Sequence, residues 1–530
     1  MGNGGFVKHS KKELMKDLPI SVQTFKRIRE ENYIYVDKTE YVYALAKKKG
    51  GSYFLSRPRR FGKSLLVNTF KELFLGNEKL FQGLWIHDKW DWSQTFPVIH
   101  LSFDSADYDG LGLDNAISYE LKKWAKHHKV ALTTNSYKTQ FEELLIKLYE
   151  KKGKVVLLID EYDKPIIDYL EKSELAQALK NQKIMKGFYS VLKNSEDYLR
   201  FFFITGVSKF SKVSIFSDLN YLKDLTIHPD FTTIVGYTQE ELVFYFDEHL
   251  EAVQKKNNMS REELLESVRL WYNGFSWDGI HKLYNPFGIL NFLDQKWLLN
   301  FWFTTGMPNF LVKVMREKLV FDVENVKINM LQLEKYDIEN LDLVPLLFQT
   351  GYLTVKSIDP TKREMILDYP NNEVRESMYS FMIDSLAKNE QRSGADVTNR
   401  DLLEAFIAAD LERIKELINS LLAGLPYEAY RKTAEGLFHG LIHFIFQLLG
   451  MYIKSEVHSS RGRADSVVET ATHVFIFEFK FKKTAEEALQ QIKDKKHADK
   501  YRASSKTIIG IGVNFVPEDK EINEWETEIL

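Results

Sequence analysis

The chain has 530 residues, 44% of them hydrophobic and 14% aromatic, with a formal net charge of −3 and no cysteine. This length is enough for roughly three domains of about 150 residues each, and the apolar content excludes an intrinsically disordered chain. The balance of charges excludes a protein that is basic over its whole surface, and the absence of cysteine excludes disulfides, thiolate zinc sites and cysteine nucleophiles and suits a reducing cytoplasm.

The N-terminal segment, residues 1–50, is polar and has helical patterning. It is interrupted by the aromatic alternation Asn32–Asp37, which predicts a short strand or an extended arm. The first residues contain no signal-peptide core, and no apolar run in the chain reaches the ~20 residues that a membrane span requires. We therefore expect a cytoplasmic protein without a membrane partner.

Between residues 51 and 235, short apolar runs alternate with longer amphipathic stretches. The apolar runs predict buried strands at Tyr53–Leu55, Pro97–Leu101, Val155–Ile159 and Leu199–Ile204. The amphipathic stretches predict helices at Lys63–Leu75, Leu113–Val130 and Tyr137–Lys151. Buried strands that alternate with helices indicate an α/β fold with a parallel sheet covered on both faces.

The sequence SRPRRFGKS, residues 56–64, joins the first of these strands to the first helix. It ends like a phosphate-binding loop, in which backbone N–H groups and a helix N-terminus hold anionic oxygens. Lys63 would reach the terminal phosphates of ATP, and Ser64 would ligate Mg²⁺, while Arg57 replaces the usual first glycine. The remaining residues expected to contact ATP are Arg59, Arg60, Phe61, Gly62 and Leu65. The three arginines are either anion-binding groups or a solvated basic loop, and their place beside the phosphates favours the first.

Two further strands end in polar residues that suit the same site. Asp160 and Glu161 follow Val155–Ile159 as in a Walker B motif, with Asp160 on the magnesium side and Glu161 polarising the attacking water. Thr205 follows Leu199–Ile204 and is either a sensor of the γ-phosphate or a simple strand terminus. These features predict binding of ATP and Mg²⁺, and they leave open whether ATP is hydrolysed or only sensed.

The middle of the chain carries fewer signals. Residues 236–395 are predicted to be mainly helical, with breaks at Tyr284–Gly288 and Thr305–Pro308 and a strand at Gly351–Val355. Asn389–Ala395 reads as a linker, and Asp401–Leu422 as one amphipathic helix. The predicted domains are thus a nucleotide-binding domain (1–235), a helical lid-like or winged-helix-like middle domain (236–395), a helical connector (396–430) and a C-terminal domain (431–530).

From Glu435 onward the pattern changes to helix, strand hairpin, helix and strand. Val474–Lys480 alternates with period two, so Glu478 and Lys480 project from one face of the strand and the phenylalanines from the other. A four-residue turn at Thr470–His473 would pair Ser466 with Phe477, which sets Asp465 close to Glu478.

Two carboxylates and a lysine at one point of a strand provide what metal-dependent phosphodiester cleavage requires. Asp465 and Glu478 would bind Mg²⁺, a hard cation that prefers oxygen ligands. Lys480 would orient or deprotonate water and stabilise developing charge. Alternating acidic and basic residues also mark an ordinary solvent-facing strand, and the position of Gly462–Asp465 at hairpin distance favours the nuclease interpretation.

Three residues on flanking segments complete this constellation. Glu435, on the helix before the hairpin, would add a carboxylate, and Glu456 is the competing candidate. Gln491 lies on the predicted helix Ala485–Tyr501 that follows the hairpin.

In combination these motifs resemble those of a bacterial family that pairs an N-terminal AAA-ATPase-like domain with a C-terminal PD-(D/E)XK nuclease-superfamily domain. The resemblance implies an ASCE/AAA-like parallel sheet, followed by an α/β nuclease core whose three defining positions are Asp465, Glu478 and Lys480. The family form of the loop also has the arginine at position 57. The matching segments are Leu18–Ile20, Tyr35–Thr39, Arg57–Ser64, Leu158–Asp163, Thr205–Lys209, Glu456, Gly462–Asp465, Glu478–Lys480 and Gln491–Tyr501.

The function predicted from these residues and this resemblance is an ATP-regulated, magnesium-dependent DNA endonuclease. Its architecture suggests defence against foreign DNA or a link to mobile elements. The alternative is a nucleotide-dependent switch that holds DNA or a protein partner without cutting, and RNA cleavage ranks below both because no RNA-recognition signature is present. A homo-oligomer is also expected, because AAA-type sites are often completed by an arginine of a neighbouring subunit.

Overall fold

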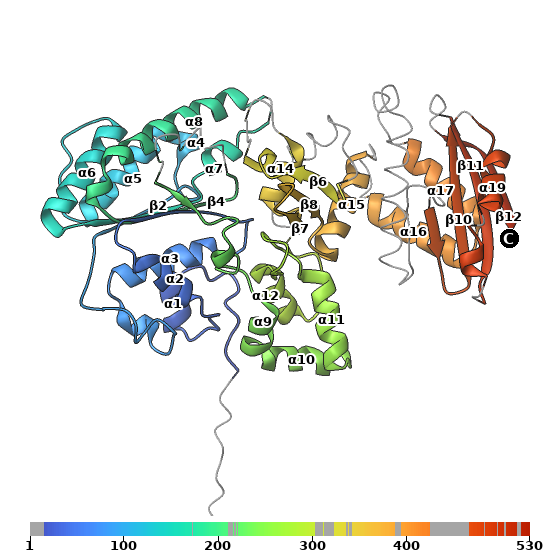
Figure 1. Ribbon diagram of the computed structural model, residues 1–530, viewed down its shortest axis with the longest axis horizontal. Coiled ribbons are helices and arrows are strands. Elements are labelled where there is room, and N and C mark those ends of the chain that lie inside the picture. The colour runs from blue at the N-terminus through green and yellow to red at the C-terminus, as the bar shows by residue number, and fades with distance from the viewer. Residues whose placement is uncertain are drawn as a thin grey trace, which may run out of the picture. The chain divides into compact units, whose positions relative to one another are not determined.

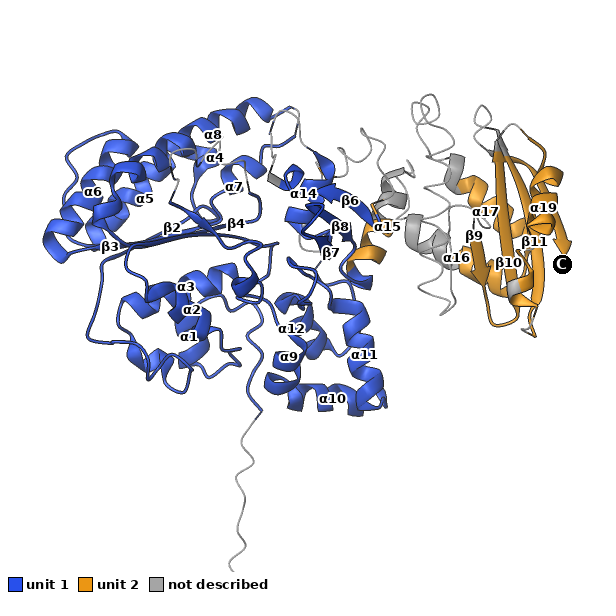
Figure 2. Cartoon of the chain, in the orientation of Figure 1, with its two compact units in different colours: residues 1–306, 324–373 blue, residues 307–323, 374–530 orange. Residues whose placement is uncertain are grey.

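The computed structural model describes residues 15–171, 173–209, 221–302, 323–334, 342–386, 394–423, 466–481, 483–495, 497–502, 505–516 and 521–530, with the single residues Phe216, Leu219, Leu311 and Ile338. The chain divides into two compact units (Figure 2), unit 1 with residues 1–306 and 324–373 and unit 2 with residues 307–323 and 374–530. Each unit has its own β-sheet structure. None of the helices in the described ranges is long and apolar enough to cross a membrane.

Unit 1 contains a five-stranded parallel sheet with the strand order β2-β3-β4-β1-β5. Four of its strands confirm those predicted from the apolar runs. All residues of β3 and β4 are buried, as expected for strands covered on both faces. The strands are β1 Gly51–Ser56, β2 Val98–Ser102, β3 Val155–Asp160, β4 Leu199–Gly206 and the two-residue β5 Lys223–Asp224.

Helices cover both faces of this sheet, as Figure 1 shows. One face carries α1 Phe25–Glu30, α2 Thr39–Ala46 and α3 Lys63–Phe74. The other carries α5 Leu113–His127, α6 Tyr137–Lys152 and α8 Leu175–Ser190, with the short α4 Tyr108–Leu111 and α7 Lys164–Ile167. The helices α3, α5 and α6 confirm the predicted amphipathic stretches, and the α/β class is therefore correct.

The order of the strands decides which residues meet at the functional edge. Strand β4 lies between β1 and β3, with Leu55 opposite Thr205 and Ile159 opposite Ile204. Because parallel strands end at the same edge of a sheet, the loop after β1, the hydroxyl on β4 and the carboxylates after β3 become neighbours. The ends of β1 and β3 lie about 100 residues apart in the chain, and those of β3 and β4 about 50. The sheet thus brings them together.

The N-terminal arm at residues 33–38 forms neither helix nor strand, so the short strand that was one alternative is absent there. Its last residue, Lys38, is buried and forms a 2.6 Å ion pair with Glu241. Glu241 also accepts the backbone N–H of Thr238 in the capping box that begins α9 Gln239–Tyr245. The arm therefore ties the region before β1 to the helices that follow the sheet.

Those helices form a compact group around an apolar core that includes Phe246, Val268 and Phe292. The predicted break at Tyr284–Gly288 is a helix start, because Asn285 caps α12 and Pro286 occupies its first turn. The other members of the group are α10 Asp247–Asn257 and α11 Arg261–Tyr272, and α12 spans Pro286–Gln295.

Unit 1 also has a three-stranded antiparallel sheet, β6-β8-β7, that the helical prediction for residues 236–395 misses. The predicted strand at Gly351–Val355 is displaced, because Gly351 has φ 91° and ends α14 in the left-handed conformation. The chain becomes a strand only from Thr354. The elements are β6 Val326–Asn329, α14 Leu343–Thr350, β7 Thr354–Asp359 and β8 Glu364–Asp368, and α15 Asn372–Leu386 then leads into unit 2.

Unit 2 contains a four-stranded mixed sheet with the order β12-β11-β10-β9. Strands β9 and β10 form the expected antiparallel hairpin, and its register pairs Ser466 with Phe477, as the turn length predicts. Strand β11 runs parallel to β10 after the crossover helix α19, and β12 is a further antiparallel strand beyond the predicted order. The elements are β9 Ser466–Glu469, β10 His473–Phe481, α19 Ala485–Asp494, β11 Thr507–Val516 and β12 Glu521–Ile529.

Both faces of this sheet are covered by helices. Phe406 packs against Phe475 and Phe477 on one face, while Ile492 of α19 joins Ile476 in the apolar cluster on the other. The predicted amphipathic helix Asp401–Leu422 is helical but interrupted, because the chain forms α16 Gly394–Ala408 and α17 Leu411–Ala423. Ala409 breaks it with φ 53°, and the Asp410 carboxylate caps α17 by accepting the N–H of Arg413 at 3.0 Å.

Candidate functional site

The loop after β1 leads directly into a helix whose first N–H groups have no intrahelical partner. Gly62 precedes α3 with φ 92°, and a Cβ at this position would meet no atom within 4 Å. Glycine is therefore favoured here by the left-handed backbone and not by crowding. Ser64 and Leu65 lie half-buried in the first turn of α3, beside the N–H groups that could bind an anion.

Lys63 is held against the loop that it would serve. Its side chain is 4% exposed, and Nζ donates to the carbonyl oxygens of Arg57 and Pro58, each at 3.0 Å. Burial lowers the pKa of this ammonium group, and the carboxylates of Glu161 and Asp160 partly oppose that change. Two neutral carbonyls compensate a buried charge less well than phosphate oxygens do, so Lys63 is suited to an anionic ligand.

The carboxylate of Asp160 is hydrogen-bonded to Thr205, near the end of the neighbouring strand β4. The hydroxyl of Thr205 donates to Oδ1 of Asp160 at 2.5 Å, and both side chains are buried. The hydrogen bond fixes the orientation of Asp160 through Oδ1 and does not involve its second oxygen. Thr205 is therefore more than a strand terminus, and its direct role in this structure is to position the carboxylate.

Glu161 follows with an unusual backbone conformation, φ 51°, which is uncommon for a residue that is not glycine. Burial raises the pKa of its carboxyl group, and the charge of Lys63 lowers it in part. Strained backbone conformations tend to occur at functional sites. A carboxylate of raised pKa beside Lys63 is suited to accept a proton from water.

The structure does not place the side chain of Arg57 where the sequence led us to expect it. The guanidinium is fully buried, donates to the carbonyl oxygens of Ser56 and Thr226 at 2.8 Å, and stacks on the ring of Trp277 at 3.9 Å. Desolvation lowers the pKa of Arg57 to about 9. Its side-chain hydrogen bonds go to carbonyl groups, so Arg57 anchors the loop from behind instead of facing a phosphate.

The other loop side chains divide between solvent and core. Arg59 is partly exposed, with its guanidinium 4.0 Å from the carboxylate of Asp168, and the exposed Arg60 lies over the ring of Phe287. Both stay candidates for anion contact. Phe61 is buried against Phe275 and Trp277, so it could contact a nucleotide only through its backbone.

Replacing Arg57 with methionine is expected to lower the free energy of unfolding of unit 1 by about 2–4 kcal/mol. The buried carbonyls of Ser56 and Thr226 would lose their donor, and Trp277 would lose the stacked cation. Urea denaturation followed by tryptophan fluorescence measures this change. The control is Arg60→Met, an exposed residue of the same loop. Equal destabilisation by both variants would contradict the anchoring role.

Asp163 supports this candidate site, although no role for it was predicted from the sequence. Its carboxylate accepts the backbone N–H groups of Val207 (3.0 Å) and Ser208 (2.5 Å), so it fixes the turn that follows Thr205. A Cβ on Gly206 would lie 2.6 Å from Oδ1 of Asp163, so only glycine leaves room for this contact. The sequence feature that could have identified Asp163 is that it is a third carboxylate just after Asp160 and Glu161.

Asp163 predicts a measurable pH dependence of stability. Burial raises its pKa in the folded protein to about 6 from 3.8, and the N–H of Ser208 partly opposes this. The folded chain then binds the proton more tightly than the unfolded chain, so stability is highest below the unfolded pKa and falls as the pH rises to about 6. We expect a loss of roughly 3 kcal/mol over this range.

The measurement is the free energy of unfolding at several pH values for the wild type and for Asp163→Asn. In the variant, the free energy of unfolding should not show this decrease between the two pKa values, because asparagine does not titrate. Asp88→Asn, an exposed carboxylate of the same unit, serves as the control. A slope that is identical in the wild type and in Asp163→Asn would refute the expectation.

The second candidate site lies on β10 in unit 2. Glu478 is 2% exposed, and Nζ of Lys480 lies 2.7 Å from Oε1 of Gln491 and 3.3 Å from Oε1 of Glu478. The structure thus brings together the three predicted residues that it describes. Asp465, Glu435, Glu456 and the rest of Gly462–Asp465 lie outside the described residues, so their proximity to Glu478 stays a prediction.

The crossover helix α19 can approach this strand because of a glycine on β11. Gly512 lies opposite Glu478, and a Cβ there would come within 2.1 Å of the carbonyl oxygen of Ala485. This close approach brings Gln491 over Lys480. Asn514 lies opposite Lys480 in the same register and is buried, so its amide is a further polar group of the site that the sequence analysis did not select.

Both sites offer the oxygen donors that Mg²⁺ prefers: the carboxylate of Asp160 and the hydroxyl of Ser64 in unit 1, and the carboxylate of Glu478 in unit 2. Within the part of the chain that the structure describes, no group of three or more histidine, aspartate or glutamate side chains could hold a metal ion. Each candidate magnesium site therefore depends on further ligands such as phosphate oxygens, water or the carboxylate of Asp465.

Comparison with known proteins matches these two sites separately. Residues 19–216 match the family described as "Predicted AAA-ATPase", and residues 433–525 match the "PD-(D/E)XK nuclease superfamily". A protein of Azotobacter chroococcum mcd 1, titled "Uncharacterized protein in vnfD 5'region", is 36% identical over 528 residues, which cover 97% of this chain and 99% of that protein. The first match includes Lys63 and Asp160, and the second includes Glu478 and Lys480.

Proposed function

Because this chain belongs to the family that joins a predicted AAA-ATPase domain to a C-terminal PD-(D/E)XK nuclease-superfamily domain, we propose that it is an ATP-binding, magnesium-dependent DNA endonuclease whose nucleotide state gates cleavage. The two domains suggest a nucleotide-dependent nuclease in general terms. DNA as the substrate, ATP as the nucleotide and the gating are our own inference. A role in defence against foreign DNA or in mobile elements is part of the same proposal.

Support for the nucleotide site comes from the polar residues that lie together at one edge of the parallel sheet. Lys63 would neutralise the terminal phosphates, while Ser64 and Asp160 would hold Mg²⁺, which stabilises the charge on those phosphates. Thr205 orients Asp160, to which it donates a hydrogen bond. Glu161 would position the water if ATP is hydrolysed, and its raised pKa favours proton acceptance near neutral pH.

The observation that carries the nuclease proposal is Lys480 placed between Glu478 and Gln491. In this arrangement Glu478 would bind the metal ion together with Asp465, and Lys480 would orient water and stabilise the charge that develops on the phosphate. Gln491 holds the ammonium group in place through its side-chain oxygen. Glu435 or Glu456 would complete the carboxylate set.

The test is cleavage of supercoiled plasmid DNA in the presence of Mg²⁺, with and without ATP, by the wild type and by Asp465→Ala. We expect nicked or linear products from the wild type, a dependence on ATP, and a rate at least about 100-fold lower for Asp465→Ala, because the ion loses a carboxylate ligand. Asp494→Ala, an exposed residue at the end of α19, is the matched control.

Equal cleavage by the wild type and Asp465→Ala would overturn the nuclease proposal, and cleavage independent of ATP would overturn the gating. ATP-dependent retention of DNA without nicks under any divalent metal would instead support a binding switch. The same assay with RNA competitor shows whether DNA is preferred. Assembly into a homo-oligomer is a separate expectation that size-exclusion chromatography with light scattering measures.

A further inference from the structure

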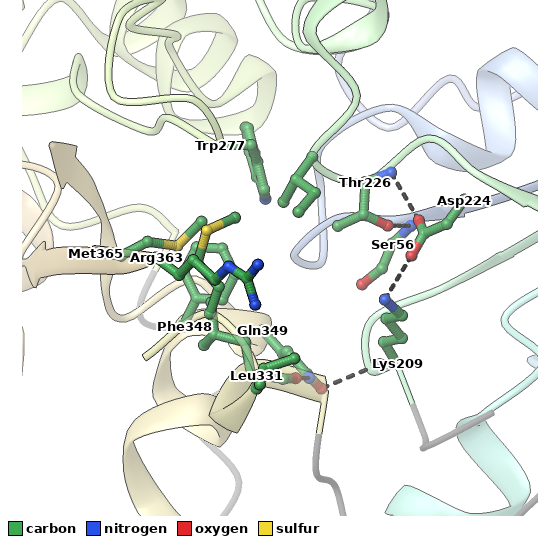
Figure 3. Close-up of a pocket in the computed structure, with 13 residues that line it drawn as sticks. Ser56, Lys209, Asp224, Thr226, Trp277, Leu331, Phe348, Gln349, Arg363 and Met365 are labelled. Atoms are coloured by element: carbon green, nitrogen blue, oxygen red, sulfur yellow. Dashed lines mark hydrogen bonds and ion pairs between the residues drawn. The ribbon is translucent and has the colours of Figure 1, made fainter. Parts of the chain in front are cut away.

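A pocket of about 390 Å³ lies in unit 1 between the end of the parallel sheet and the small antiparallel sheet, as Figure 3 shows. Its walls are mainly apolar and include Trp277, Leu333, Phe348 and Met365. This volume falls within the range of small-molecule sites, which are typically apolar with a few placed polar groups. The residues proposed to contact phosphate and Mg²⁺, Lys63, Ser64 and Asp160, are not among those that line it.

The pocket has one solvent-exposed cation, Arg363, at its wall. The guanidinium of Arg363 points into the pocket (Figure 3), and it has no ion-pair or hydrogen-bond partner among the described residues. The other cation, Lys209, is already paired with Asp224 at 2.7 Å. An apolar cavity with a single available guanidinium favours a ligand that has an apolar body and one anionic group.

The wall of this pocket also includes Ser56, the first residue of the candidate phosphate-binding loop. Ser56, Thr226 and Trp277 line the pocket, and each of them contacts the guanidinium of Arg57. A ligand in the pocket would therefore touch the residues that hold the side chain of Arg57. The carbonyl of Arg57 is one of the two to which Lys63 is bonded.

We propose that this pocket is a regulatory site for a small amphipathic anion, whose aromatic or aliphatic body fills the apolar part and whose carboxylate, sulfonate or phosphate pairs with Arg363. Occupancy of the pocket changes the affinity of the loop for nucleotide through Arg57 and Lys63. This second statement rests on the proposed nucleotide binding, whereas the existence of the site does not.

Binding is tested with 8-anilinonaphthalene-1-sulfonate, an aromatic anion that becomes fluorescent in apolar sites, on the full-length chain with excess MgATP. We expect saturable binding that Arg363→Gln and Ile227→Trp each weaken about tenfold or more, the first by removing the charge and the second by filling the space. Ile227 lines the pocket and is 39% exposed, so a larger side chain there need not disturb the core.

Matched controls are Lys362→Gln, which removes the same charge one residue away, and Ile280→Trp, the same exchange at an isoleucine that is 78% exposed and outside the pocket. Both should bind the probe as the wild type does. The site is refuted if the wild type shows no saturable binding, if the pocket variants bind normally, or if the controls lose binding equally.

Coupling is tested with a fluorescent ATP analogue titrated in the presence and absence of the probe. A shift of at least threefold in nucleotide affinity in the wild type, lost in Arg363→Gln, supports regulation. Normal binding of both ligands without a shift would overturn regulation but not the site. If no nucleotide binds at all, the proposed nucleotide function fails, and regulation of it fails with it, while probe binding at the pocket is judged separately.

Discussion

Replacing Lys480 with alanine is expected to reduce DNA cleavage by about 10²–10⁴-fold while the protein stays folded and still binds DNA. The ammonium group lies 3.3 Å from the carboxylate of Glu478 and is held by Gln491 at 2.7 Å. It is therefore placed to act on water and on the charge that develops at the phosphate. Its removal affects the chemical step, whereas binding of the DNA backbone depends on other groups.

The measurement is the initial rate of plasmid nicking with Mg²⁺ and ATP, together with a DNA-binding assay in Ca²⁺. Lys493→Ala is the matched control, because Lys493 lies on α19 in the same domain but pairs with Glu528 at 2.5 Å on the surface. Gln491→Ala should cause a smaller decrease, about tenfold, because Lys480 loses only its support. Cleavage by Lys480→Ala at the rate of the Lys493→Ala control would show that this strand is not the active site.

Replacing Lys63 with alanine is expected to weaken ATP binding by about 100-fold or more, because the loop loses the buried cation that we propose neutralises the phosphates. Since Nζ now bonds two loop carbonyls, the variant should also leave the loop less ordered without nucleotide. In the gated mechanism, cleavage by this variant would no longer respond to ATP.

Titration with a fluorescent ATP analogue measures the affinity directly. Lys71→Ala is the control, because this lysine lies in the last turn of the same helix, away from the loop. If Lys63→Ala binds ATP as tightly as Lys71→Ala, the loop is not the nucleotide site. If it loses ATP binding but still cleaves in an ATP-stimulated manner, the nucleotide acts at another place.

The sequence predicts the strands of the parallel sheet well where burial is complete. Runs such as Val155–Ile159 and Leu199–Ile204 have to be buried on both faces, and the parallel β3 and β4 satisfy this requirement. The register of the β9–β10 hairpin also follows from the sequence, because the four-residue turn at Thr470–His473 fixes which residues face each other. Glu478, Lys480 and Gln491 could be selected on that basis.

Other features depend on partners that are distant in the chain. Arg57 looks like an anion-binding residue in sequence, but Thr226 and Trp277, more than 160 residues further along, provide the carbonyl and the ring that bury it. Most of the antiparallel sheet β6-β8-β7 is missed for a different reason. Its strands are short and partly exposed, so they lack the apolar pattern that identified the buried strands.

The sequence by itself determined the candidate residues: a lysine and a serine after a buried strand, carboxylates after another, and a glutamate and a lysine on one face of a third. It did so because these assignments depend on local order and on periods of two and 3.6 residues. Only the tertiary structure decided which polar groups meet. The strand order places Thr205 against Asp160, brings Asp163 to the turn after β4 and turns Arg57 inward, since hydrogen-bond partners are set by the packing of distant segments.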